Sequence, residues 1–140
     1  MKHKNLILGL SIFTAIGTIF YWILVFTGVF SLEEIVPGYV TWFMSFPLAD
    51  FWIVITSTLL AISTKRNNRS AMIVCGLLSA SSMIFLALNG LVFGINTGMI
   101  CMFTVDEVIE IGIKIYFLSV GVFFIKEFSS QIKKLNMSNI

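Results

Sequence analysis

Charged residues are scarce in this chain of 140 amino acids, of which they make up only 11 %. Soluble domains carry about 25 % charged residues, which cover the surface that faces water. Hydrophobic residues reach 58 % here, above the usual range of about 45–50 %. So few charges cannot cover a water-soluble surface of this size. The composition therefore predicts an integral membrane protein, whose apolar exterior faces the lipid bilayer.

Histidine and cysteine are almost as scarce. His3 is the only histidine, which excludes a bis-histidine haem site within one chain and histidine-based catalysis inside the membrane. Cys75 and Cys101 form no CxxC pair and fit no zinc spacing. The sequence has no glycine-rich phosphate loop, no HExxH motif and no basic run with interleaved aromatics. We expect no metal, no cofactor and no nucleic-acid partner, and we identify no catalytic residue.

What the chain does contain is long apolar runs. A transmembrane helix needs about 20 mostly apolar residues, and four segments meet or approach this length, at about residues 6–30, 47–64, 71–95 and 104–125. Pro47 suits the first turn of the second span, and Thr104 with Glu107 forms a capping box for the fourth. We predict an all-α membrane protein, a single domain over residues 1–140, with four transmembrane helices in an antiparallel bundle.

Residues 31–50 interrupt the apolar pattern between the first two spans. Two glutamates, a proline and a glycine within residues 33–38 form a break, and Tyr39, Trp42 and Phe46 follow at near-helical spacing. Tyrosine and tryptophan concentrate at the membrane–water boundary. We predict an irregular or short interfacial segment between the first two transmembrane helices, lying on the outer leaflet.

The basic residues indicate an orientation, because lysine and arginine near span ends favour the cytosolic side. With four spans, all of them outside the membrane fall on one side: Lys2, Lys4, Lys65, Arg66, Arg69, Lys126, Lys133 and Lys134. The opposite side has no lysine or arginine in its loops and collects the acids Glu33, Glu34, Asp50, Asp106 and Glu107. We predict a multi-pass protein of the cell membrane with both termini in the cytosol.

Glu110 and Lys114 are the most unusual residues of the fourth span, because ionisable groups are costly in hydrocarbon. At 1.5 Å per residue they lie roughly 9 and 15 Å from the start of the span. Their i,i+4 spacing, with the acid first, favours an ion pair. Two interpretations of Glu110 and Lys114 stay open. They form either a self-neutralising pair that faces the bundle interior, or a charged element of a binding site or proton path.

Three further polar residues are candidates for a ligand-binding site. Asp50 and Glu107 lie in first helical turns, where an acid also complements the helix dipole, as Asp106 does. Asn89 lies in the third span, where an interhelical hydrogen bond is the alternative role. We hypothesise that Asp50, Asn89 and Glu110 converge in one outward-facing polar pocket. The candidate ligand-binding residues are Asp50, Asn89, Glu107, Glu110 and Lys114.

The third span carries two further patterns. Cys75, Ser82, Asn89 and Asn96 recur every seven residues and predict a weakly polar seam for contacts between helices. A second stripe consists of small residues, namely Gly76, Ala80, Ala87, Gly90 and Gly94. Small residues let helices approach closely, and we expect this stripe to pack within one chain rather than between two chains.

Short motifs in the second to fourth spans give a resemblance. They are Phe46–Trp52 (FPLADFW), the short basic turn that follows, Leu88–Gly90 (LNG) and Asn96–Met99 (NTGM). Together they resemble a group of small prokaryotic four-span membrane proteins that has no established activity. The resemblance covers most of the chain and implies the four-span architecture. It adds no function, but it directs attention to Asp50 and Asn89.

Three functions are compatible with these observations. The leading hypothesis is a small integral membrane protein that binds or transports a cation or a small polar ligand through an acidic pocket. The second is a non-catalytic accessory subunit of a larger membrane complex. The third is a lipid-modifying or isomerising enzyme, which would need an apolar cavity open to lipid and would be excluded by a solid four-helix core. A homo-oligomer or a larger complex stays open, and the balance leans against an enzyme.

Overall fold

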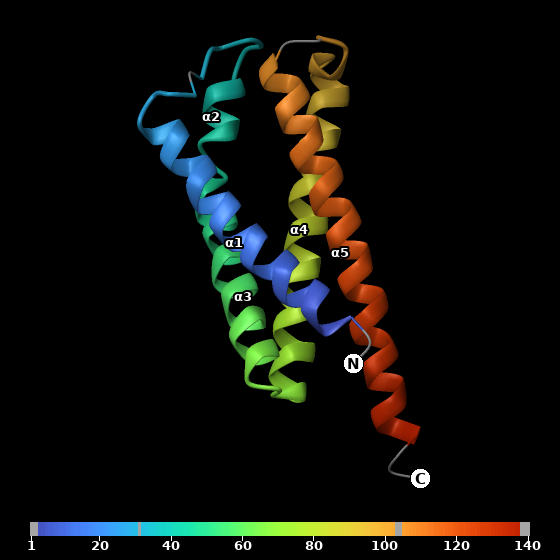
Figure 1. The fold of residues 1–140 in the computed structure, drawn as a ribbon. Coiled ribbons are helices and arrows are strands. Elements are labelled where there is room, and N and C mark those ends of the chain that lie inside the picture. Colours follow the sequence, from blue (N-terminus) through green and yellow to red (C-terminus); the bar gives the residue numbers. More distant parts are fainter. Residues whose placement is uncertain (1–2, 31, 103–104, 138–140) are drawn as a thin grey trace.

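The computed structural model describes residues 3–30, 32–102 and 105–137. Four long helices run antiparallel to one another (Figure 1): α1 (Lys4–Phe26), α3 (Pro47–Lys65), α4 (Arg69–Thr97) and α5 (Val105–Met137). A short helix α2 (Tyr39–Phe43) precedes α3, and a 3-10 turn η1 (Met99–Cys101) follows α4. All four long helices are apolar and long enough to cross a bilayer, α2 and α3 forming one span. The predicted all-α bundle of four transmembrane helices is confirmed.

Two helix ends differ from the predicted spans. The first helix ends at Phe26 and not near residue 30, because Gly28 takes a φ of +73° and the chain turns there. The last helix continues past residue 125 to Met137, and its polar end is held by a hydrogen bond from Arg69 to Gln131 Oε1 at 3.0 Å. Thr104 and the side chain of Asp106 lie outside the described part of the chain.

The end of the bundle that holds α2 is covered by aromatic side chains. We call this the α2 cluster: Trp22, Val25, Tyr39, Phe43 and Met99, all buried. Trp42 stacks on Phe93 of α4, with ring centroids 3.8 Å apart and planes inclined by 9°. The carboxylate of Glu34 fixes the start of α2 by accepting hydrogen bonds from the N–H groups of Gly38 and Val40. The predicted short segment between the first two spans is therefore a packed helix.

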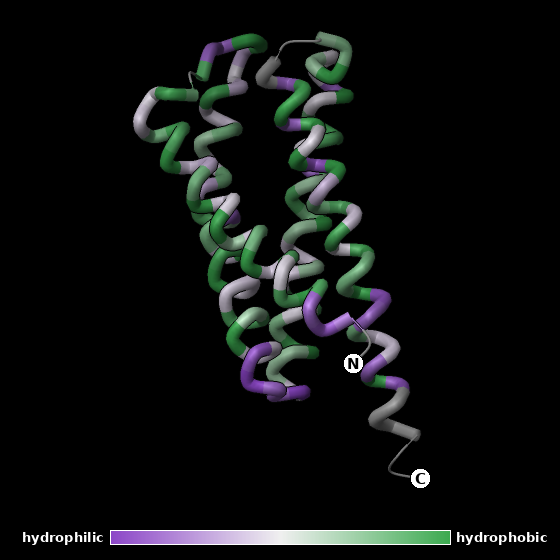
Figure 2. The backbone as a smooth tube through the Cα atoms, in the orientation of Figure 1, coloured by the Kyte–Doolittle hydropathy of each residue, from purple (hydrophilic) through white to green (hydrophobic). Residues whose placement is uncertain are grey.

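Hydrophilic residues gather at the opposite end, which holds the start of α1, the turn between α3 and α4 and the last turns of α5 (Figures 1 and 2). Lys4 Nζ donates a hydrogen bond to Asn67 Oδ1 at 2.6 Å, which ties the start of α1 to the turn between α3 and α4. The Arg69–Gln131 bond ties the same turn to the end of α5. We call this the terminal end of the bundle.

The small-residue stripe of α4 packs within the chain, as expected. Gly76, Ala80, Ala87, Gly90 and Gly94 are all buried. A Cβ on Gly76 would lie 2.0 Å from the ring of Phe128 in α5, so the two helices could not approach as closely with alanine there. Ser79 Oγ of α4 lies 2.9 Å from Ser57 Oγ of α3 and forms a polar contact between these two helices. The predicted seam does not supply it: Ser82 bonds to Leu78 O of its own helix.

The helices pack in the order α1, α3, α4, α5, and α1 reaches α5 through its first half. Thr14 Oγ1 lies 2.9 Å from Tyr116 Oη, and the rings of Phe13 and Tyr116 meet edge to face. Closer to the terminal end, His3 contacts Phe123. The second half of α1 tilts away toward α2 and α3 (Figure 1). This tilt separates the two helices near α2 and positions the site described next.

Candidate functional site: an aromatic cavity with a carboxylate on α3

A cavity of about 520 Å³ lies between the helices in the α2 half of the bundle. Its walls come from α1, α2, the start of α3, the middle of α4 and the first turns of α5. Nine of its lining residues are aromatic: Phe13, Phe20, Tyr21, Trp22, Trp42, Phe43, Phe46, Tyr116 and Phe117. Asp50, Glu110 and Lys114 are its charged lining residues. The volume is within the usual range of about 300–1,000 Å³ for small-molecule sites.

Asp50 enters the cavity from the first turn of α3, which begins at Pro47. Its carboxylate Oδ2 accepts a hydrogen bond from Trp22 Nε1 at 2.8 Å. Within the described residues, no lysine or arginine nitrogen lies within 4.0 Å of Asp50. The two ion pairs among these residues join Lys114 to Glu107 and to Glu110. In the described part of the chain, the indole N–H of Trp22 is the one side-chain partner of this half-buried carboxylate, which keeps most of its charge uncompensated.

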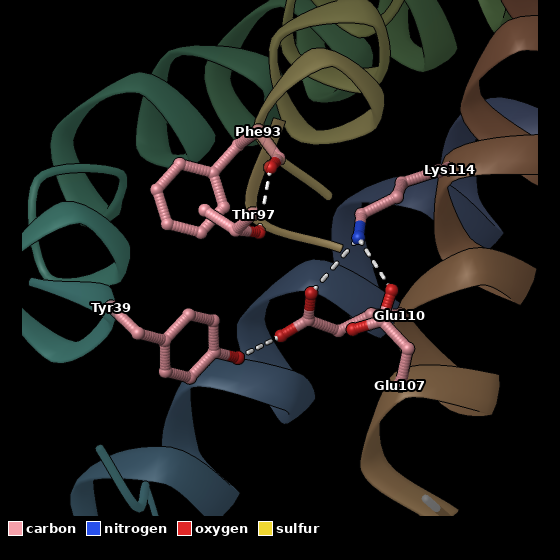
Figure 3. A network of polar contacts seen from close by, with 6 residues as sticks. All are labelled: Tyr39, Phe93, Thr97, Glu107, Glu110 and Lys114. Atoms are coloured by element: carbon pink, nitrogen blue, oxygen red, sulfur yellow. Dashed lines mark hydrogen bonds and ion pairs between the residues drawn. The ribbon is translucent and has the colours of Figure 1, made fainter. Parts of the chain in front are cut away.

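Glu110, Glu107 and Lys114 form a separate polar network on α5 (Figure 3). Lys114 Nζ lies 3.0 Å from Glu110 Oε2 and 3.7 Å from Glu107 Oε1. The phenol of Tyr39 donates a hydrogen bond to Glu110 Oε1, so this carboxylate has a partner on each oxygen. The three charged side chains are 3–12 % exposed. The i,i+4 pair predicted from the sequence therefore forms and faces the interior, where Glu110 and Lys114 also line the cavity.

Gly90 of α4 makes room for the lysine. A Cβ at this position would lie 2.9 Å from Lys114 Cε and 3.5 Å from its Cδ. The alkyl chain of Lys114 therefore crosses the glycine backbone of α4 before the ammonium meets its carboxylates. Gly94 lies one turn further along α4, and a Cβ built on it would lie 3.8 Å from Glu107 Oε1. Two glycines of the small-residue stripe thus position the charged network as well as the helices.

An aromatic wall separates the two acidic positions of the cavity. Starting from Asp50, it runs through the ring of Trp22 to Phe43, with centroids 5.4 Å apart, and on to Tyr39 at 5.8 Å. Tyr39 then reaches Glu110. Each ring of this wall contacts the next, and the two acids are hydrogen-bonded at its ends. A ligand between them would meet carboxylates and aromatic faces together.

The structure brings together three of the five candidate residues. Asp50, Glu110 and Lys114 line one cavity. Glu107 lies behind Lys114 and is joined to the cavity through that ion pair. Asn89 is half-buried on α4, and it is Gly90, the next residue, that lines the cavity.

Sequence reasoning missed Trp22, Tyr39, Tyr116 and Gly90. Each of them supports a charged or polar group of the site from another helix. A weak signal existed for two of them: an aromatic residue with a polar tip that lies within an apolar run needs a partner for that tip. For Gly90, the small-residue stripe indicated close packing between helices but did not indicate that Lys114 would be the neighbouring side chain.

The charges of the site are unbalanced. Among the described residues, the carboxylates of Asp50 and Glu110 and the ammonium of Lys114 are the charged groups that line the cavity, and the ammonium is shared with Glu107. Among the described residues, no group of three or more histidine, cysteine, aspartate or glutamate side chains could hold a metal ion. The arrangement can neutralise a positive charge within an apolar, aromatic surrounding.

Comparisons with protein-family models, with curated proteins and with solved structures return no match. The resemblance to a group of prokaryotic four-span proteins therefore stays a prediction.

Proposed function

We propose that this protein binds a small organic cation with an apolar body in the cavity between its helices. The observation that carries the proposal is Asp50, a half-buried carboxylate without a cationic partner in the described structure, among aromatic rings. Burying a charge is costly unless it is paired. A ligand ammonium beside Asp50 would supply the missing positive charge.

The aromatic lining favours an organic cation over a bare metal ion. Cations bind over the faces of tryptophan, tyrosine and phenylalanine with about 0.5–2 kcal/mol each, and aromatic cages are a common site for quaternary ammonium groups. Calcium takes about 6–8 oxygen ligands, whereas the charged oxygen donors of this cavity belong to Asp50 and Glu110, and Glu110 is already paired. The aromatic lining and the small number of oxygen donors therefore narrow the proposed ligand from any cation or small polar molecule to an alkylated or aromatic amine.

The Lys114 network has a supporting role in the proposal. Its ammonium lies 3.0 Å from Glu110 and 3.7 Å from Glu107, so of the two carboxylates that line the cavity it leaves that of Asp50 for the ligand. The same ammonium repels a second cation. We therefore propose a site for one positive charge at Asp50. The network of Glu110, Glu107 and Lys114 adds its own charges to the cavity and so determines the net charge that the ligand meets.

The basic terminal end supports an orientation with both termini in the cytosol. Lys4 of α1 and Arg69 of α4 are hydrogen-bonded at this end to Asn67 and to Gln131 of α5, and the positive-inside rule places basic residues near span ends on the cytosolic face. The cavity then lies in the outer half of the membrane. We propose binding from this half, and flux across the membrane would be a separate property to be measured in vesicles.

A thermal-stability panel tests the proposal. A ligand that binds only the folded state stabilises it by RT ln(1 + [L]/Kd), about 2.7 kcal/mol at a hundred times Kd. We expect alkylammonium and arylammonium ions to raise the melting temperature in mild detergent, and their neutral isosteres to leave it unchanged. The shift should be absent in Asp50→Asn and intact in Glu33→Gln, which changes an exposed acid outside the cavity. Equal shifts for charged and neutral compounds would contradict the proposal.

An enzyme that modifies or isomerises a lipid is the second candidate, because the apolar cavity it requires is present and has carboxylates on two walls. The two functions differ in one observable. An enzyme converts a bound neutral lipid to a new compound, whereas the binding protein releases its cation unchanged. The accessory-subunit hypothesis is tested separately by copurification from native membranes, where it requires a stoichiometric partner.

A further inference from the structure

We propose that the cavity opens sideways to the bilayer, between α1 and α5, and that its ligand is an amphiphilic amine that enters from the lipid. The inference rests on the proposed function for the positive charge of the ligand. It adds the route and the chemical class: an ammonium head for Asp50 and a hydrocarbon or aromatic tail for the remaining lining. The opening itself is independent of any ligand and can be tested without one.

The rim of the cavity consists of side chains that face lipid. Phe13 and Phe20 of α1 are 64 % and 59 % exposed, and Ile109 of α5 is 42 % exposed. All three line the cavity, so its boundary continues onto the outer surface of the two helices. Large apolar side chains with this exposure on spanning helices lie against hydrocarbon.

Hydrogen bonds and ring contacts join α1 to α5 on one side of the rim, at His3, Leu10, Phe13 and Thr14. All four residues belong to the first half of α1 or to its cap. Beyond Thr14 the cavity is lined by Gly17, Thr18, Phe20 and Tyr21 of α1. Tyr116 therefore marks the closed edge of the opening.

The route from water is covered. At the α2 end, Tyr39 is 3 % exposed, Phe43 is 6 % exposed and Trp22 is 8 % exposed. The Tyr39–Glu110 hydrogen bond joins α2 to α5, and the Trp42–Phe93 stack joins the α2 segment to α4. Residues that roof the cavity toward water are thus bonded and buried, whereas those at its side are exposed and apolar.

Two glycines provide a way to fill the opening without disturbing the core. Gly17 of α1 and Gly112 of α5 line the cavity, and a Cβ on either would meet no atom within 4 Å. A leucine at either position would enter empty space in the opening. Gly9 of α1 has equally free surroundings and lies outside the cavity lining, so Gly9→Leu is the matched control.

The experiment uses Trp22 as a reporter of lipid in the cavity. A variant with Trp42→Phe and Trp52→Phe keeps Trp22 as the only tryptophan. It is reconstituted in phosphatidylcholine vesicles whose acyl chains carry bromine, which quenches nearby tryptophan fluorescence. We expect strong quenching by brominated lipid and little by aqueous iodide. Gly17→Leu and Gly112→Leu should each remove most of the lipid quenching, and Gly9→Leu should leave it unchanged.

Quenching by iodide without quenching by brominated lipid would overturn the inference, and so would lipid quenching that neither leucine variant reduces. The outcomes separate the two proposals. If the leucine variants block lipid quenching and no amine binds, the lateral opening stands and the proposed function fails. If amine binding depends on Asp50 but Trp22 is reached from water, the proposed function stands and the lateral route is wrong.

Discussion

Lys114 is the residue on which the charge balance of the cavity depends. Its ammonium contacts two carboxylates that are 3–7 % exposed. Removing one partner of a buried ion pair leaves an uncompensated charge and costs about 3–5 kcal/mol. Lys114→Met should therefore lower the free energy of unfolding by about 3 kcal/mol. Thermal unfolding in mild detergent measures this, and the double variant Lys114→Met, Glu110→Gln should recover part of the loss. A single variant as stable as the native protein would contradict the ion-pair account.

Gly90 permits the path of the lysine side chain, and a methyl group there should disturb it. The new Cβ would lie 2.9 Å from Lys114 Cε, so the flexible side chain must move. We expect Gly90→Ala to cost about 1–3 kcal/mol, the usual range for overpacking, although alanine favours helix more than glycine does. Gly9→Ala, where a Cβ meets no atom within 4 Å, should instead be neutral or stabilising. Equal thermal stability of the two variants would count against the positioning role of Gly90.

The sequence predicted the residue contacts that are local and missed those that join different helices. Glu110 and Lys114 are four residues apart on one helix, where geometry alone brings them together. Trp22 and Asp50 are 28 residues apart, and Tyr39 and Glu110 are 71 apart. These pairs depend on how α1 and α2 are rotated and tilted against their neighbours. Hydropathy does not encode that rotation, because both faces of a spanning helix are apolar.

At the scale of elements, helix α2 is held over the cavity by few polar contacts. Tyr39 Oη donates to Glu110 from a residue that is 3 % exposed. Losing a hydrogen bond to a charged group costs about 1.5–3 kcal/mol. Tyr39→Phe should therefore increase hydrogen exchange of α2 amides, measured by mass spectrometry in detergent. Tyr116→Phe makes the same chemical change at the α1–α5 contact and should leave α2 exchange unchanged. Equal protection of α2 in both variants would show that the Tyr39 hydroxyl does not fix it.

The existence of the four long helices could be predicted from the sequence, and their ends could not in every case. Pro47 starts α3 as expected, since its missing N–H is not needed in a first turn. The first helix ends earlier than hydropathy indicates, because Gly28 turns the chain while the residues around it remain apolar. The last helix extends further, because Gln131 finds Arg69 across the bundle. Both differences arise from local backbone geometry or from tertiary contacts, and hydropathy averaged along the sequence contains no information on either.

At the scale of the whole molecule, the orientation can be tested with thiol chemistry. Cys101 is exposed in η1, at the α2 end of the bundle. We expect a membrane-impermeant maleimide to label it in intact cells, in a Cys75→Ser background. With Cys101 replaced by serine, Asn68→Cys at the terminal end should react only after the membrane is permeabilised. Labelling of position 68 in intact cells would reverse the proposed orientation.

The antiparallel bundle followed from the sequence, whereas the aromatic lining of the cavity did not. Four spans with short connections pack as antiparallel neighbours, and we predicted a polar pocket of Asp50, Asn89 and Glu110 between them. The opening lies beyond the contacts of Phe13 and Thr14 with Tyr116, because α1 packs mainly against α3. A tilt of this kind is set by side-chain packing between helices. The three candidates Asp50, Glu110 and Lys114 were identified by their cost in hydrocarbon, and the structure adds the aromatic surroundings that give them a ligand class.

Binding of an amphiphilic amine at Asp50 is the central claim, and calorimetry in lipid nanodiscs measures it most directly. Dodecyltrimethylammonium would be titrated into the native chain, Asp50→Asn and Glu33→Gln, with dodecyl maltoside as the uncharged amphiphile. We expect saturable binding of one cation per chain in the native protein and in Glu33→Gln. Binding should be lost in Asp50→Asn and absent for the uncharged amphiphile. Equal affinity of the native protein and Asp50→Asn for the cation would contradict the account.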